Sequence, residues 1–143
     1  MGEEGSDPSV IRSVAVTAED VVAAVESHHQ REERVVLRVT PPFSGRMRAR
    51  IHVSAVDGTG ETGAVHVDPT ILLDDEAPPY PRPADTEDDL RADPDTEYTV
   101  ERHHERHRKA LERWRDRLPE HVRDRVTVET AEGPVTVDVA VLG

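Results

Sequence analysis

Apolar and polar residues alternate in several short stretches of the chain, which is the pattern of half-buried β-strands. In the first half of the sequence this pattern predicts strands at 10–16, 34–40, 46–56 and 64–68. We expect the last two strands to form a hairpin across the glycine-rich residues 57–63. Valines at helical spacing after Thr17 predict a short helix between the first two strands, with Thr17 as its N-cap.

The second half combines a longer helical pattern with two more strands. Apolar residues and two histidines recur every three or four positions at Val100, His104, His107, Leu111, Trp114 and Leu118. This spacing predicts an amphipathic helix at 98–117. Alternation at 126–130 and 135–141 predicts a second hairpin. Together the elements predict one α+β domain, a largely antiparallel sheet or open barrel of about six strands with two helices packed on it.

Residues 74–97 differ in composition from the stretches on either side. They include ten acidic residues, two arginines and five prolines. Because proline lacks a backbone donor and like charges repel each other, we expect this segment to be an extended surface connection. It would interrupt a single domain at 10–143, which a disordered tail at 1–9 precedes.

Charge and composition limit the class of protein. The chain has 143 residues, enough for one domain, and a net charge of -12 from 30 acidic and 18 basic residues. It has no cysteine, which excludes disulfides, thiol nucleophiles and cysteine-ligated metal sites. No apolar stretch approaches the roughly 20 residues of a membrane helix, and the start Met1-Gly2-Glu3-Glu4 is acidic. We therefore expect a cytoplasmic protein with no membrane partner.

The charged residues are of the kinds found in proteins adapted to concentrated salt. Of the 18 basic residues 17 are arginine, and only Lys109 is lysine. An acidic surface retains water and hydrated cations in concentrated salt, where its self-repulsion is screened. The chain resembles a family of small proteins of halophilic archaea, a domain of unknown function, most clearly in Val35-Val36-Leu37-Arg38-Val39-Thr40-Pro41-Pro42-Phe43-Ser44-Gly45-Arg46. The resemblance implies no activity.

Arginines form the first candidate site. Arg46, Arg48 and Arg50 alternate along one predicted strand and should project from one face about 7 Å apart. The predicted C-terminal helix adds Arg102, Arg106 and Arg113. Residues 98–125 hold nine basic and six acidic side chains, so this region is positive within an acidic chain.

These arginines favour a non-catalytic module that binds an unknown protein or a polyanion. Phe43, Tyr98 and Trp114 are available to stack on bases if that polyanion is a nucleic acid. Nucleic acid is not favoured in concentrated salt, because binding driven by counterion release weakens steeply there. This interpretation involves no cofactor.

Histidines support a second interpretation, a metal-binding protein or metalloenzyme. His66 and Asp68 lie on one face of a predicted strand, and His52 should lie on the same face of its neighbour. Two imidazoles and a carboxylate suit iron or zinc. His103 and His107, one helical turn apart, are a further pair that could chelate a metal.

Strand edges and a glycine-rich motif suggest two further interpretations. The chain could be a structural subunit that forms homo-oligomers through the edges of its strands. Gly58-Thr59-Gly60-Glu61-Thr62-Gly63 has the spacing of a dinucleotide-binding loop. A strand rather than a helix is predicted after this motif, so a turn is favoured over a nucleotide site.

The fold should depend on salt concentration. Raising KCl from about 0.05 M to about 3 M should raise the midpoint of thermal unfolding, because salt screens the repulsion among the acidic side chains. The measurement is a thermal melt followed by circular dichroism at each salt concentration. Equal midpoints and equal spectra would contradict an adaptation to concentrated salt.

Overall fold

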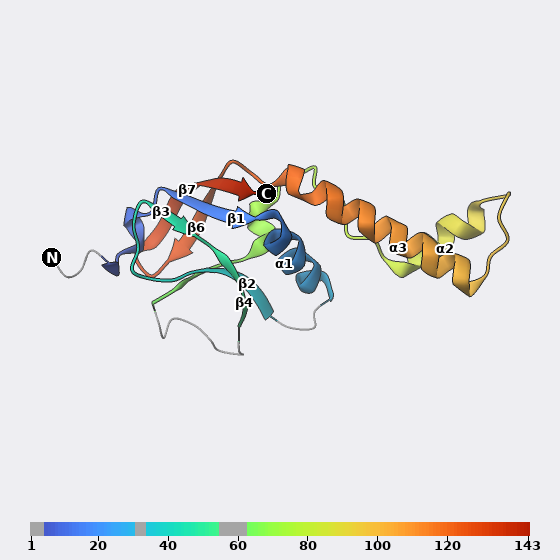
Figure 1. Ribbon diagram of the computed structural model, residues 1–143, viewed down its shortest axis with the longest axis horizontal. Coiled ribbons are helices and arrows are strands. Elements are labelled where there is room, and N and C mark those ends of the chain that lie inside the picture. The colour runs from blue at the N-terminus through green and yellow to red at the C-terminus, as the bar shows by residue number, and fades with distance from the viewer. Residues whose placement is uncertain (1–4, 31–33, 55–62) are drawn as a thin grey trace.

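The computed structural model describes residues 5–30, 34–54 and 63–143 (Figure 1). The strands in these ranges are β1 (Ser13–Thr17), β2 (Arg34–Val39), β3 (Arg46–Arg48), β4 (Arg50–Ser54), β5 (Val65–Val67), β6 (Arg125–Thr130) and β7 (Gly133–Leu142). The α-helices are α1 (Ala18–Gln30), α2 (Pro83–Ala92) and α3 (Val100–Arg117). Short 3₁₀ helices lie at Pro8–Val10, Pro69–Leu72 and Leu118–His121. None of the helices in the described ranges is long and apolar enough to cross a membrane.

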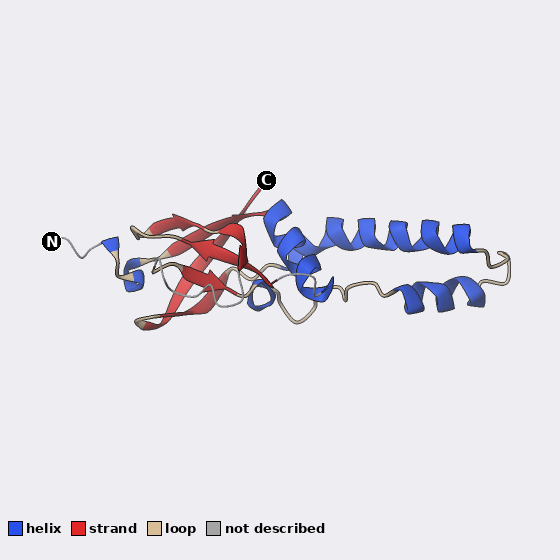
Figure 2. Ribbon diagram, turned by 90° about the horizontal axis from the view of Figure 1, so that it is seen from below, coloured by secondary structure: helices blue, strands red, loops and turns tan. Residues whose placement is uncertain are grey.

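The strands form two open sheets that enclose one hydrophobic core (Figure 2). The first sheet has the order β3-β1-β7-β6 and is mixed, because β1 pairs in parallel with β3 and β7 whereas β6 and β7 are antiparallel. The second sheet has the order β4-β2-β5 and is antiparallel. Val14 and Val137 of the first sheet and Leu37 and Val67 of the second lie in the same buried cluster. A single core therefore joins both sheets.

The α+β class is confirmed, but the prediction of one six-stranded sheet or barrel is wrong. The strand expected at 46–56 breaks at Ala49, which is 1% exposed and donates its backbone N–H to the carbonyl oxygen of Ala15 at 2.9 Å. This buried break places β3 in the first sheet and β4 in the second. Since β2 lies between β4 and β5, the hairpin expected between 46–56 and 64–68 is wrong as well.

Some predictions concern the ends of elements and loops. Residues 57–62, which include most of the glycine motif, lie outside the described residues, as do residues 1–4 of the expected tail. From Gly5 onward the chain contacts the fold, because Phe43 donates its backbone N–H to the Gly5 carbonyl oxygen at 2.8 Å.

The predicted N-cap of α1 is confirmed, since Thr17 Oγ1 accepts the backbone N–H of Asp20 at 3.0 Å.

The acidic segment 74–97 contains α2, where an extended connection was expected. Pro83 lies in the first turn of α2, where its missing N–H interrupts no helical hydrogen bond. Thr86 and Leu90, one turn apart, are buried on one face of the helix. Repulsion among the acidic residues of α2 is relieved in part by the Glu87–Arg91 ion pair at 2.9 Å. Burial of one face of α2 against a segment distant in the sequence therefore outweighs the repulsion among its acidic residues.

The partner of α2 is α3, and the two helices form an arm that projects from the sheets (Figures 1 and 2). The predicted amphipathic helix at 98–117 is confirmed as α3. Its apolar stripe is buried at the base of the arm, where Trp114 is 3% exposed, whereas Val100 near the tip is 56% exposed. The N-terminal half of the stripe therefore does not contribute to the core.

The base of the arm is fixed to the body by aromatic and charged contacts. Trp114 Nε1 donates to the carbonyl oxygen of Pro78 at 3.0 Å, and the Trp114 ring meets the Tyr80 ring edge-on at 4.9 Å. Arg115 donates to both carboxylate oxygens of Glu26 on α1, at 3.0 and 2.7 Å. Burial and hydrogen bonding thus orient α3 as it leaves the body.

Substitution of Trp114 should test this anchor. Trp114→Ala should lower the free energy of unfolding by about 3–5 kcal/mol through the lost burial, and Trp114→Phe by about 1 kcal/mol through the lost hydrogen bond plus imperfect repacking. Chemical denaturation followed by circular dichroism measures both values. Arg113→Ala, one residue away and exposed, is the control and should change the free energy by less than about 0.5 kcal/mol. Equal stabilities of all three variants would contradict the anchor.

Candidate functional site

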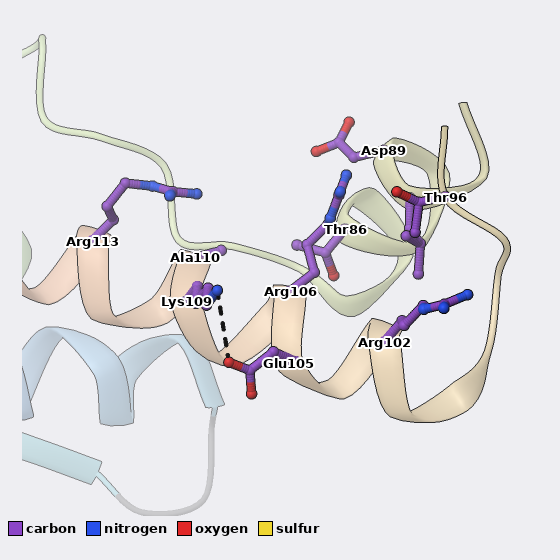
Figure 3. A pocket seen from close by; sticks show the side chains of 10 residues that line it. Thr86, Asp89, Thr96, Arg102, Glu105, Arg106, Lys109, Ala110 and Arg113 are labelled. Atoms are coloured by element: carbon purple, nitrogen blue, oxygen red, sulfur yellow. Dashed lines mark ion pairs between the residues drawn. The ribbon is translucent and has the colours of Figure 1, made fainter. Parts of the chain in front are cut away.

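A groove of about 460 Å³ lies between α2 and α3 on the arm (Figure 3). We call it the arm groove. Its most buried lining residues are Thr86 and Leu90 of α2. Four of its lining side chains are cationic and come from α3: Arg102, Arg106, Lys109 and Arg113. The arm groove thus gathers positive charge in a chain whose net charge is -12.

Helical geometry explains why the four cations share one flank of α3. They are separated by four, three and four residues, which places them close to one line along a helix. At about 1.5 Å of rise per residue the row extends over about 16 Å. The whole of α3 carries seven basic and four acidic residues, and the groove receives most of the basic ones.

The four cations differ in how firmly the chain itself holds them. Arg102 donates to the carbonyl oxygen of Glu97 at 2.8 Å, and Arg106 pairs with Asp93 at 3.2 Å. Lys109 lies 3.8 Å from a carboxylate oxygen of Glu105, and Arg113 forms no ion pair with any described residue. Ion pairs this exposed contribute at most about 1 kcal/mol each, so an external anion can replace them.

Carboxylates also line the groove. Asp89 projects from α2 and Glu105 from α3 (Figure 3). Arg108 donates to Glu105 at 2.6 and 3.3 Å and thereby holds the pKa of Glu105 below its ordinary value. Glu105 is therefore ionised at neutral pH, and the groove carries separate negative positions among its cations.

A polar cluster fixes α2 against α3 beside the groove. Thr86 is 5% exposed, and its hydroxyl oxygen lies 3.0 Å from His103 Nε2 and 3.1 Å from His107 Nδ1. The hydroxyl also donates to the carbonyl oxygen of Pro83 at 3.0 Å. Burial, together with the neighbouring His103, lowers the pKa of His107. These histidines therefore have a structural partner on α2.

The predicted arginines divide into two groups. Arg102, Arg106 and Arg113 come together in the arm groove, whereas the row Arg46, Arg48 and Arg50 lies on the sheets and does not line the groove. The buried break at Ala49 splits this row between β3 and β4. All three arginines of the row are exposed, and none forms an ion pair with another described residue. They remain a predicted binding surface, separate from the groove.

The predicted metal ligands are only partly brought together. His52 and His66 lie with ring centroids 5.8 Å apart. Asp68 instead caps a 3₁₀ helix, where its carboxylate accepts the backbone N–H and the hydroxyl of Thr70 at 2.9 and 2.7 Å. Arg38 Nη1 lies 3.2 Å from His52 Nδ1, and this positive charge disfavours a cation at the histidine pair. Across the described ranges, no group of three or more His, Asp or Glu side chains could hold a metal ion.

The aromatic side chains expected to stack on bases have other contacts. Phe43 is 5% exposed and Trp114 3% exposed, so both belong to the core. The Arg91 guanidinium covers the ring of Tyr98, with its central carbon 3.8 Å from the ring centroid. The groove lining includes no aromatic residue.

Sequence reasoning missed Lys109, Asp89 and Glu105 as groove residues. The helical spacing that links Arg102 to Arg106 and Arg113 also includes Lys109, and this signal was present in the sequence. Asp89 and Glu105 had no such signal, because the groove exists only where α2 packs on α3.

The comparisons with known proteins give a family but no activity. A family model described as "Domain of unknown function (DUF8009)" matches residues 1–143, the whole chain. No curated protein and no solved structure matches the chain. The match carries no taxon, so the halophilic source remains a prediction.

Acidification should weaken the packing of α2 on α3. The pKa of His107 in the fold lies below its ordinary 6.5, so the neutral form is favoured in the folded state. The contribution of His107 to the free energy of unfolding is fully present above pH 6.5. It is lost as the pH falls from 6.5 through the lower pKa that His107 has in the folded state. Amide hydrogen exchange in α2, corrected for intrinsic rates, should therefore be several-fold faster at about pH 5 than at about pH 7.5.

The histidine assignment has a matched control. His107→Asn should reduce this pH dependence, whereas His104→Asn, on the same helix but exposed, should leave it unchanged. An equal pH response in the wild-type chain and in both variants would show that His107 does not cause it.

Proposed function

We propose that this chain, which belongs to the DUF8009 family, is a non-catalytic binding module whose helical arm engages an anionic partner through the arm groove. The observation that carries the proposal is the row of four cations along α3. A protein of net charge -12 repels anions over most of its surface. The row of cations is therefore the place in the groove where an anionic partner can form several ion pairs in direct contact.

The pairing of the cations supports binding rather than a purely structural role. Arg108 and Arg115 on the same helix each make two short contacts to carboxylates, Arg108 within α3 and Arg115 to Glu26 of α1. By contrast, Lys109 has a long contact, and Arg113 has no ion pair among the described residues. Two of the four groove cations, Lys109 and Arg113, are thus held weakly or not at all by the described part of the chain.

The groove chemistry also favours binding over catalysis. General acids and bases work best when their pKa lies near the operating pH. The pKa of Glu105 is lowered by Arg108, and that of Asp93 by hydrogen bonds from the backbone of Asp95 and the side chain of Thr96. His103 and His107 are engaged with Thr86. Fixed charges of this kind suit recognition of an anion.

We further propose that the module works in concentrated salt. At about 1 M salt the screening length is about 3 Å, so only ion pairs in direct contact retain their energy. A groove that offers several contacts at fixed spacing can still bind an anion under these conditions, whereas long-range steering cannot contribute.

Matched charge removal tests the groove. The triple variant Arg102→Gln, Arg106→Gln and Arg113→Gln should bind fluorescent poly-L-glutamate about tenfold or more weakly than the wild-type chain, because three ion pairs are lost. The salt dependence of the remaining binding should also be shallower. Fluorescence anisotropy measures both effects, at the lowest KCl concentration at which circular dichroism shows the full fold.

The control carries the same change in net charge. The triple variant Arg46→Gln, Arg48→Gln and Arg50→Gln should retain most of the binding. If this control loses binding and the groove variant keeps it, the site is the arginine row on the sheets. If the wild-type chain does not bind poly-L-glutamate, the proposed function is wrong.

A further inference from the structure

The arm groove alternates in charge rather than being uniformly positive. Glu105 on α3 interrupts the row of Arg102, Arg106, Lys109 and Arg113, and Asp89 on α2 lies across the groove from Arg106 (Figure 3). Nucleic acids and sulfated sugars carry negative charge along every repeat, so a chain of this kind in the groove would lie against Glu105 or Asp89. Like charges in contact across an interface are a strong penalty against the wrong partner.

The groove also lacks the features that give single-stranded nucleic acids their affinity for proteins. Stacking of bases on aromatic rings contributes about 1–3 kcal/mol per base. The groove lining contains no aromatic residue, and the nearby Tyr98 ring is covered by Arg91 at 3.8 Å. Such a ligand would thus meet repulsion without the compensating stacking energy.

A polypeptide can satisfy the alternating pattern. Its acidic residues can be separated by neutral ones, so that carboxylates meet the cations while amides or hydroxyls meet Asp89 and Glu105. Acidic side chains placed every three or four residues on a helix match the spacing of the groove cations, four, three and four residues.

The arm itself shows one carboxylate bound to this flank of α3. The segment 83–92 is a helix with four acidic residues and one arginine, and it packs beside α3. Asp93, directly after this helix, pairs with Arg106 at 3.2 Å. The flank of α3 therefore accepts a carboxylate from the residue that directly follows an acidic helix.

From these observations we infer that the groove binds an acidic segment of a partner protein, with carboxylates at helical spacing, and that Asp89 and Glu105 determine specificity by excluding nucleic acids. This inference rests on the proposed function, because it names the class of the anionic partner. The partner inserts carboxylates between the cations and leaves uncharged positions opposite Asp89 and Glu105.

Three fluorescent probes test the inference with the full chain. The first is a peptide with glutamates spaced four, three and four residues apart, and the second has the same composition with its glutamates consecutive. The third is an oligothymidylate of equal formal charge. The spaced peptide should bind to the wild-type chain about tenfold more tightly than the oligothymidylate and more tightly than the consecutive peptide.

Neutral variants identify the residues responsible. The double variant Asp89→Asn and Glu105→Gln should bind the oligothymidylate at least several-fold more tightly than the wild-type chain. The control is Asp88→Asn and Glu112→Gln, which removes two exposed acidic residues from the same helices outside the groove lining. Because both variants change the net charge equally, a larger gain in the first variant isolates the groove carboxylates.

Each contrary result has a distinct meaning. Equal or tighter binding of the oligothymidylate to the wild-type chain overturns the inference, and the proposed function stands if that binding still depends on Arg102, Arg106 and Arg113. An equal gain in the two double variants removes the role of Asp89 and Glu105. Self-association seen by light scattering, if lost in the groove arginine variant, assigns the groove to a second copy of this chain. Absence of binding to all three probes overturns both proposals.

Discussion

The arm is held together by few buried side chains, and this constraint shapes the exposed surface of the molecule. Packed helices usually exclude water with a continuous apolar seam. On α2, Leu90 is 1% exposed, and the next buried side chain on the same face is the hydroxyl-bearing Thr86. Hydrogen bonds are directional, so the contacts of Thr86 with His103 and His107 define how α2 lies along α3.

A narrow contact between the helices leaves most of α3 exposed, and the helix uses its faces differently. Arg115 connects α3 to α1 through Glu26, and Trp114 is enclosed by the chain around Pro78 and Tyr80. The flank of α3 that lines the groove carries four cations, of which Arg102 and Arg106 also contact Glu97 and Asp93 in the connection to α2. The base of the arm therefore accounts for stability, and the outer part is available for recognition.

Local features of the sequence predicted more than non-local ones. Thr17 acts through a hydrogen bond within three residues, and the apolar spacing of α3 lies within one element, so both helices were readable without the fold. Helix α2 was not, because its buried face at Thr86 and Leu90 depends on α3. The order of the strands depends on the break of the chain at Ala49, which the regular alternation across 46–56 does not reveal. For the same reason three groove arginines were identified, but not the groove.

The arginine row on the sheets has a structural explanation that the groove cations lack. β3 and β4 are each an edge strand, and Arg46, Arg48 and Arg50 are exposed on these edges. Charged side chains on short edge strands oppose pairing with the edge of another molecule. Protection of the edges explains, without any ligand, why arginine alternates with apolar residues here. It also argues against homo-oligomers formed through these edges. The cations of α3 lie on a helix, where no edge needs protection, so an external anion is the better explanation of their alignment.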